Sequence, residues 1–288
     1  MVASIQFIEQ VIERMERAAA ANLATPGRNG ALVTLPHDAP DAAAEVMITG
    51  DLHGHRVNFN KIRKLADLAG NPRRHLIMQE VVHGGQKYAN NGCMSHAMLE
   101  DAAKMKVDYP GRFHFLLSNH ELSEATGYPI QKGGSLLNLM FRLGVDHMYG
   151  AATDAVMASY HAFIRSCPLG VRWSGAFACH SLPEAVVRTK FDAGVFSRPW
   201  TRPDLDPRGG VFELVWGRDY TESNARAFAD LVGATVLLCG HEPNDAGYAT
   251  PNSLQVVFDC CHQVACYAIL PANQPLTQEK VVALIRKL

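Results

Sequence analysis

The chain has 288 residues, of which 48% are hydrophobic and 19% are charged. This composition supplies enough apolar material for a substantial core and excludes an intrinsically disordered protein. The 27 lysines and arginines nearly balance the 28 aspartates and glutamates, for a net charge of −1. Without a basic excess, neither a nucleic acid nor an anionic membrane is expected as a partner. The apolar runs also fall short of the roughly 20 residues that a membrane-spanning helix needs.

The first segment of the chain is expected to form an amphipathic helix. Five apolar residues recur there at helical spacing: Ile5, Ile8, Val11, Ile12 and Met15. Charged residues interrupt this pattern, which excludes a secretory signal peptide. We expect the helix to pack on the surface of the domain, with a membrane or a partner protein as the alternative contact.

Residues 22–44 are rich in Gly, Pro, Asn and Asp and predict a surface connection. The sequence is therefore divided into an N-terminal helix and linker, residues 1–44, and a main domain, residues 45–288.

The main domain alternates short apolar runs with helix-like segments. Buried strands are predicted at residues 46–49, 76–78, 113–117, 176–179, 236–239 and 254–258. Helices are predicted at residues 60–69, 95–105, 136–143, 154–166 and 224–231. Strands and helices in alternation indicate an α/β architecture.

The seven cysteines are odd in number and lack the paired spacing of a zinc site. Several lie in apolar, strand-like runs, which favours free buried thiols in a reducing compartment and hence a cytoplasmic protein. The run Cys260-Cys261-His262 is assigned to packing in or beside a strand rather than to a metal site, because neighbouring residues in a strand point to opposite faces.

A polar residue follows each of five predicted strands: Asp51, Glu80, Asn119, His180 and His241. In α/β sheets, functional sites assemble from the loops at the carboxyl ends of the strands, so these five side chains can converge. Each of the five is a competent metal ligand, which ordinary polarity at strand ends does not predict.

Two of these positions lie in short motifs. In Gly50-Asp51-Leu52-His53-Gly54, a carboxylate and an imidazole two residues apart can reach one cation, because the glycines permit a tight turn. In Ser118-Asn119-His120-Glu121, the amide oxygen of Asn119 can bind a hard cation while His120 faces a substrate.

Together with His180 and His241, these motifs resemble the calcineurin-like metallophosphoesterase superfamily, and within it the phosphoprotein phosphatase branch most of all. Leu214-Val215-Trp216 and the pair Gly247-Tyr248 after His241 resemble further segments of that branch. The resemblance covers residues 46 to 270 and implies an α/β fold with a central β-sandwich flanked by helices.

The resemblance also implies a site for two metal ions. The ligands that it implies are Asp51 and His53 on the first metal, Glu80 between the metals, and Asn119, His180 and His241 on the second. Two such cations activate a water molecule and stabilise charge during in-line attack on phosphorus. Nitrogen and oxygen ligands without thiolate suit Mn, Fe, Zn or Co and do not choose among them.

His120 and Glu121 are the catalytic residues that the resemblance implies. His120 resembles the proton donor to the leaving oxygen, a task suited to a group that titrates near neutral pH. Glu121 is expected to orient neighbouring groups rather than to take part in the chemistry.

One motif departs from the family pattern Gly-Asp-x-x-Asp-Arg-Gly, which here reads Gln79-Glu80-Val81-Val82-His83-Gly84-Gly85. Glu80 retains the bridging carboxylate with one additional methylene. His83 replaces the acid that partners the proton donor, and Gly84 replaces an arginine that binds phosphate in two places.

Other residues must therefore bind the phosphate. Arg218 is the first candidate, and Lys87 and Arg56 are weaker ones. His55 and His83 are expected either to contact the substrate or to line the site.

The resemblance implies hydrolysis of phosphate monoesters, with phosphorylated Ser/Thr proteins as the leading substrate class and small phosphoesters as the broader one. Two alternatives remain open. One is a hydrolase of nucleotides or dinucleoside polyphosphates, because related enzymes share the metal motifs. The other is a catalytically weakened phosphatase-like protein that binds a phosphorylated partner, which the altered motif around Glu80 suggests.

Overall fold

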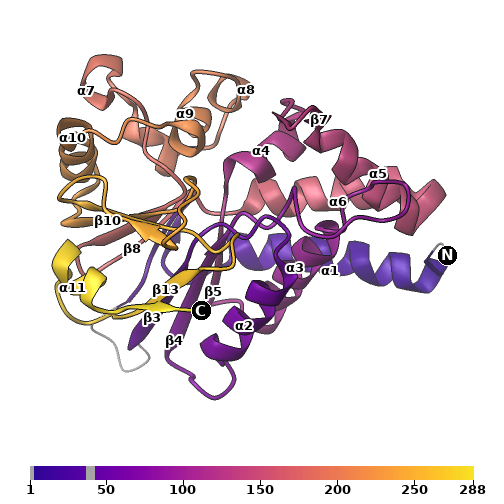
Figure 1. The fold of residues 1–288 in the computed structure, drawn as a ribbon, viewed down its shortest axis with the longest axis horizontal. Helices are drawn as coiled ribbons and strands as arrows, with labels where there is room; N and C mark the ends of the chain where they lie inside the picture. The colour runs from indigo at the N-terminus through magenta and orange to yellow at the C-terminus, as the bar shows by residue number, and fades with distance from the viewer. Residues whose placement is uncertain (1–2, 37–42) are drawn as a thin grey trace.

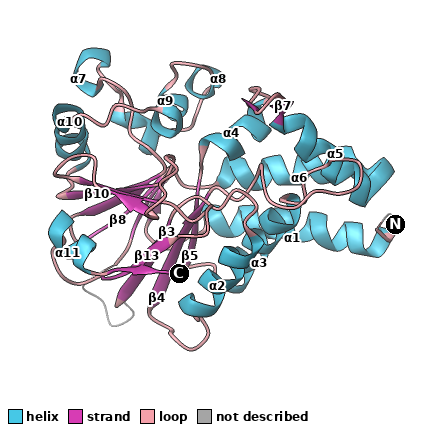
Figure 2. Ribbon diagram, viewed as in Figure 1, coloured by secondary structure: helices cyan, strands magenta, loops and turns pink. Residues whose placement is uncertain are grey.

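A computed structural model describes residues 3–36 and 43–288 of the chain. Two β-sheets pack face to face, and helices cover their outer faces (Figure 1, Figure 2). This arrangement confirms the predicted α/β fold with a central β-sandwich flanked by helices.

The six predicted strands are all present, as β3, β4, β5, β9, β10 and β12. The first sheet has the order β1 (Arg28–Asn29), β2 (Leu32–Thr34), β8 (Gly170–Trp173), β9 (Ala176–Cys179), β10 (Val236–Cys239), β12 (Gln255–Phe258) and β11 (Tyr248–Ala249). The second has the order β14 (Ile285–Lys287), β13 (Cys266–Pro271), β3 (Glu45–Thr49), β4 (Arg74–Gln79) and β5 (Phe113–Leu116). A separate hairpin joins β6 (Gln131–Lys132) to β7 (Ser135–Leu136).

The predicted strands run parallel within each sheet. β3, β4 and β5 are parallel in the second sheet, and β9, β10 and β12 are parallel in the first. A parallel bridge between Asp51, after β3, and Asp259, after β12, joins the carboxyl ends of the two sheets. The loops that follow these strands therefore gather at one end of the sandwich.

Both faces of the central strands are buried, which explains their continuous apolar runs. Ile48 and Ile77 pack with Leu238 in a cluster between the two sheets. Leu76 and Met78, on the opposite face of β4, belong to the larger cluster that contacts the helices. This alternation fixes which residue at each strand end faces the interior of the sandwich.

The helices of the described chain surround the sandwich. They are α1 (Ile5–Leu23), α2 (Arg56–Ala66), α3 (His96–Asp108), α4 (Asn119–Thr126), α5 (Leu137–Tyr149), α6 (Thr153–Ser166), α7 (Val186–Thr189), α8 (Arg202–Leu205), α9 (Gly210–Trp216), α10 (Glu222–Val232) and α11 (Gln278–Ala283), with short 3₁₀ turns at Gly150–Ala152 and Ala193–Phe196. Figure 1 shows α1, α3, α5 and α6 gathered on one side and α7 to α10 on another.

The predicted N-terminal helix is present as α1 and packs on the domain, against α3 and α6. Val11 and Met15 are fully buried, as the helical spacing predicts, whereas Ile5 at the first turn is 76% exposed. None of the helices in the described ranges has the length and apolar character to cross a membrane.

The predicted surface connection contains two strands that the composition does not reveal. β1 and β2 form a hairpin, and β2 extends the first sheet by pairing in parallel with β8. Arg28 fastens this hairpin, because its Nη1 donates to the carbonyl oxygens of Asn22 (2.9 Å) and Ser166 (2.7 Å). Residues 37–42 of the predicted linker lie outside the described residues.

All five helices predicted in the main domain are present with shifted boundaries. α2 begins at Arg56 instead of residue 60, because Nδ1 of His55 accepts a hydrogen bond from the backbone N–H of Asn58 (3.2 Å) and caps the helix. It ends at Ala66 because Asp67 adopts a left-handed conformation with φ of 37°.

The seven cysteines are free thiols, and six of them are buried. Cys260 to His262 lie in the loop between β12 and β13 rather than in a strand, so the alternation of strand residues does not govern them. Asp259, Cys261 and His262 bring three potential ligand atoms within 4.8 Å of one another. However, the Asp259 carboxylate already accepts from the backbone N–H groups of Asn244 and Cys261, both at 2.7 Å, which supports a capped loop and the packing interpretation.

Two buried histidines on neighbouring strands are expected to make the fold sensitive to acid. Nδ1 of His75 on β4 lies 3.0 Å from Nε2 of His114 on β5. Burial, with the nearby charges of Arg112 and Lys106, lowers the pKa of His75 to about 4. Burial and His75 lower the pKa of His114 well below its usual value.

The folded protein therefore keeps His75 neutral at a pH where the unfolded chain binds a proton. We expect the free energy of unfolding to fall as the pH drops from about 6.5 to 4, with His75 contributing about 3 kcal/mol of that loss. Urea unfolding at several pH values measures this slope. His75→Asn places a polar atom at the position of Nδ1 without titrating and should flatten the slope, whereas the exposed His262→Asn should leave it unchanged; equal slopes in all three proteins would contradict the assignment.

Candidate metal centre

The six predicted metal ligands converge at the carboxyl ends of the central strands. Asp51 and His53 follow β3, and Glu80 directly follows β4. Asn119 is the first residue of α4, after β5, while His180 and His241 follow β9 and β10. Except for His53, which is partly exposed, these side chains are buried.

Nitrogen and oxygen atoms are crowded on the His180 side of the centre. The Asn119 Oδ1 atom lies 2.7 Å from Nε2 of His180 and 3.2 Å from Nδ1 of His241. The same His180 nitrogen lies 3.0 Å from Oε2 of Glu80 and 3.1 Å from the His241 nitrogen.

Gln79 decides which His180 nitrogen carries the proton. Nε2 of Gln79 donates to the carbonyl oxygen of Thr49 (3.1 Å), so its Oε1 atom faces His180 Nδ1 at 2.9 Å. An amide oxygen only accepts, so Nδ1 of the neutral imidazole is the donor and Nε2 presents a lone pair. His180, Asn119 and Glu80 then direct lone pairs toward one another, an arrangement that a bound cation stabilises.

Acceptors are also in excess at Asp51 and across the rest of the centre. Oδ2 of Asp51 accepts from the backbone N–H of His241 at 2.7 Å. Within the described part of the chain, Oδ1 of Asp51, Oε2 of Glu80 and Nε2 of His241 are buried without a hydrogen-bond partner. Buried oxygen and nitrogen atoms with unused lone pairs are the kind of ligand atom that the two predicted metal ions need.

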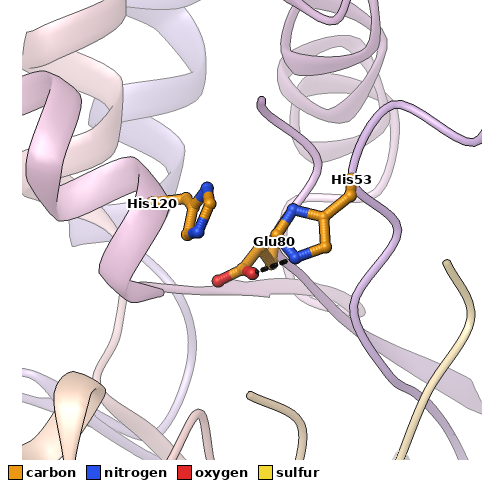
Figure 3. A group of neighbouring side chains, drawn as sticks. All are labelled: His53, Glu80 and His120. Atoms are coloured by element: carbon orange, nitrogen blue, oxygen red, sulfur yellow. Dashed lines mark ion pairs between the residues drawn. The ribbon is translucent and has the colours of Figure 1, made fainter. Parts of the chain in front are cut away.

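Glu80 occupies the middle of the centre. Figure 3 shows its carboxylate between His53 and His120, with Oε1 at 2.8 Å from Nε2 of His53. Its other oxygen is the one near His180. The Glu80 side chain, one methylene longer than aspartate, thus reaches both His53 and His180, as a bridging ligand must.

Charge in the centre is unevenly shared between the two buried acids. Burial and the neighbouring Glu80 charge raise the pKa of Asp51 well above its usual value. Burial would also raise the pKa of Glu80, but His120, His53 and His180, when protonated, outweigh it and lower that pKa well below the usual value. With His180 neutral, bound cations would supply the positive charge that keeps Glu80 ionised beside Asp51.

The backbone around the centre is strained. His53, Glu80 and His241 have φ values of 40°, 43° and 74°, a left-handed region that residues other than glycine rarely adopt. Gly240 lets the Asp51 carboxylate approach, because a Cβ atom there would lie 2.2 Å from its Oδ1. Such strain persists where surrounding contacts hold ligands in place.

Glu121 holds the loop that carries Glu80. Its Oε1 accepts from the backbone N–H groups of Val81 (2.9 Å) and Val82 (3.2 Å), and its other oxygen binds the Ser118 hydroxyl. Both oxygens of Glu121 are therefore engaged by this loop and by Ser118, and an orienting role for Glu121 stays a prediction.

His83 requires a correction. From the sequence, His83 is expected to contact the substrate or line the site, but its side chain is completely buried behind His120. Its Nδ1 lies 2.9 Å from Nδ1 of His120, and its Nε2 lies 2.6 Å from Oε1 of Glu124. Burial between these two partners prevents direct contact with a phosphoester.

The other predicted substrate residues lie at the periphery. The Nδ1 atom of His55 caps α2. Arg218 is 47% exposed, and its Nε donates to Oε1 of Glu242 at 2.6 Å, beside His241. Arg56 forms an ion pair with Asp101 of α3, and Lys87 is exposed. Arg218 thus remains the candidate beside a proposed ligand, with its charge shared with Glu242.

Two further features were not predicted from the sequence. The first is the hydrogen bond of Gln79 to His180, and the second is that of Glu124 to His83. Both join residues far apart in the sequence, so only the fold reveals them. Burial would lower the pKa of His53, but the Glu80 carboxylate outweighs it and raises that pKa.

Comparison with known proteins gives a match in structure alone. No protein-family model and no curated protein sequence matches the chain. A protein serine/threonine phosphatase from Saccharomyces cerevisiae, described as similar to human phosphatase PP5, aligns with a TM-score of 0.71 at 13% identity, covering 98% of this chain and 89% of that one. A cold-active protein-tyrosine phosphatase from a psychrophilic Shewanella aligns with a TM-score of 0.52 at 12% identity, covering 87% and 80%. The chain has the fold of the calcineurin-like metallophosphoesterases, as its motifs predict.

Proposed function

We propose that this protein is a metal-dependent phosphatase that hydrolyses phosphate monoesters. The observation that carries the proposal is the cluster of lone pairs from Glu80, Asn119 and His180, which lies at the predicted ligand positions. The metallophosphoesterase fold supports it, because both described structural matches are named as phosphatases.

Each side chain has a proposed part in the reaction. Asp51 and His53 would hold one metal ion, Asn119, His180 and His241 the other, and Glu80 both. When bound, the two ions supply Lewis acidity to an attacking water and to the phosphoryl oxygens. His120, whose Nδ1 faces His83, keeps Nε2 free to give a proton to the leaving oxygen.

The proposed substrates are phosphorylated Ser/Thr proteins in the cytoplasm. Similarity in fold to a serine/threonine phosphatase supports the substrate class, and the free buried thiols support the compartment. The exposed Arg218 is the proposed phosphate contact, in place of the arginine that Gly84 replaces.

Metal removal and restoration test this proposal. Protein stripped with a chelator should lose hydrolysis of 4-nitrophenyl phosphate and of a phosphoserine peptide, and one or more of Mn, Fe, Zn and Co should restore both. Metal analysis of the active protein should give two ions per chain. Turnover that survives chelation with no bound metal would contradict the proposal. A preference for dinucleoside polyphosphates over both esters would favour the nucleotide hydrolase instead.

One observation favours a second candidate, a phosphatase-like protein that binds a phosphorylated partner with slow turnover. Gly84 removes an arginine from the motif, and Arg218 shares its charge with Glu242. Tight binding of a phosphoserine peptide, measured by calorimetry, with turnover far below that of the aryl ester would support this candidate.

A further inference from the structure

Three buried side chains form a hydrogen-bonded chain that leads away from the candidate centre. His120 contacts His83 through their Nδ1 atoms at 2.9 Å, and Nε2 of His83 contacts Oε1 of Glu124 at 2.6 Å. We propose that Glu124 is a positioning residue of the reaction, which acts through His83 to hold His120 as proton donor. This inference rests on the proposed phosphatase function.

The carboxylate fixes the direction of the hydrogen bonds along the chain. An ionised Glu124 only accepts, so Nε2 of His83 donates to it. The neutral His83 ring then has its lone pair on Nδ1, which accepts from the Nδ1–H group of His120. To act as the proton donor, His120 carries a second proton on Nε2, so its ring is an imidazolium. When the P–O bond of the ester breaks, this Nε2 proton passes to the leaving oxygen, and the neutral ring keeps its Nδ1 proton.

Glu124 is itself held in place. It lies one turn after His120 on α4, and its side chain is only 3% exposed. Nδ2 of Asn138 on α5 donates to the same Oε1 atom at 3.0 Å. A carboxylate buried to this degree needs hydrogen-bond donors, and Nε2 of His83 and Nδ2 of Asn138 supply them at its Oε1 atom.

This series of hydrogen bonds explains how His120 can still work as a proton donor with a histidine at position 83. The sequence alone suggests that an imidazole at position 83 costs His120 its acid partner. In the structure, an acid is still connected to His120, but through the His83 ring, because Glu124 accepts a hydrogen bond from Nε2 of His83. Outer partners of this kind orient the groups that they contact and typically change activity by about 10–100-fold when removed.

Leaving-group dependence tests the proposal. A phosphoserine peptide has a poor leaving group that needs a proton, whereas 4-nitrophenyl phosphate has a good one that does not. Glu124→Gln keeps the size of the side chain and removes its charge. We expect kcat for the peptide to fall by about tenfold or more, and kcat for the aryl ester to change much less.

A matched control separates positioning from stability. Glu100 on α3 is also buried and also accepts from a histidine one turn away, with Nδ1 of His96 at 3.0 Å. Glu100→Gln removes a comparable buried charge outside the centre, so it should alter both substrates alike, even where it lowers the melting temperature as much as Glu124→Gln does.

A second variant keeps the test decisive. Oδ1 of an aspartate occupies the place of Nδ1 in a histidine, so His83→Asp brings a carboxylate oxygen directly beside Nδ1 of His120. Combined with Glu124→Gln, which avoids two buried acids side by side, it should recover the peptide activity that Glu124→Gln loses.

Three results would overturn the inference. Equal loss for both substrates in Glu124→Gln, no loss for either, or a double variant no more active on the peptide than Glu124→Gln would each contradict a positioning role while leaving the phosphatase function intact. Absence of metal-dependent turnover in the unchanged chain would overturn the proposed function, and this inference with it.

Discussion

Asp51→Asn should remove metal-dependent hydrolysis while the fold remains. The carboxylate is buried, one of its oxygens has no hydrogen-bond partner among the described residues, and the other fixes the backbone of His241. An amide can still accept at that backbone N–H but binds a cation far more weakly. Since removing an outer partner of a ligand costs about 10–100-fold, removing the ligand itself should cost more than about a hundredfold in kcat/KM.

The neighbouring Asp259→Asn is the matched control. Asp259 faces Asp51 across the bridge between the two sheets, is equally buried, and caps a loop through the N–H groups of Asn244 and Cys261. We expect it to retain two metal ions and most of the activity. Metal analysis, steady-state kinetics and circular dichroism of both variants give the comparison. Full activity in Asp51→Asn, or loss of metal only in Asp259→Asn, would reject the proposed ligand set.

The strands that the sequence predicts are those buried on both faces. β3, β4 and β10 are continuous apolar runs because each lies between the other sheet of the sandwich and a layer of helices. β8 carries the exposed Arg172 between buried neighbours, so its composition does not stand out. β1 and β2 are only two and three residues long and are defined by pairing rather than by composition.

The candidate site divides in the same way. Candidate ligands at strand ends, such as Asp51 and His241, can be brought together from the sequence, because topology alone places the carboxyl ends of parallel strands at one edge. The partner of His83 is not, because it depends on which way a buried ring turns. The separation of four residues between His120 and Glu124 places both on one face of α4, but nothing in the sequence links that face to His83.

The loop at Gly84 leads to a prediction opposite to the one that the family pattern suggests. Gly84 stands where the family pattern has a phosphate-binding arginine, so Gly84→Arg looks like a restoration. In the structure, a Cβ atom at this position would lie 2.1 Å from the backbone oxygen of His53, far inside contact distance. A Cβ atom at Gly54 would lie 2.2 Å from the backbone oxygen of Gly84, and one at Gly85 would lie 2.2 Å from that of Gly54, so the two loops pack backbone against backbone here.

Gly84→Arg must therefore displace His53 or its own loop, which also carries Glu80. We expect a loss of metal binding and of activity, and a fall in the free energy of unfolding of about 1–3 kcal/mol, the usual cost of overpacking. Gly84→Ala should produce most of the same loss, because the first carbon of the side chain causes the clash. Gly111→Ala, whose added carbon would meet atoms no nearer than 3.7 Å, is the control and should be silent.

Kinetics, metal content and urea unfolding of the three variants decide between the two views. If Gly84→Arg raises kcat/KM while Gly84→Ala does not, the arginine reaches the phosphate, the two loops yield to it, and the chain is a weakened phosphatase lacking one contact. If both lower activity together with metal content, the close packing of Gly84 on His53 is part of the centre itself. The contact of 2.1 Å is to backbone rather than to the end of a flexible side chain, which is why we expect the second outcome.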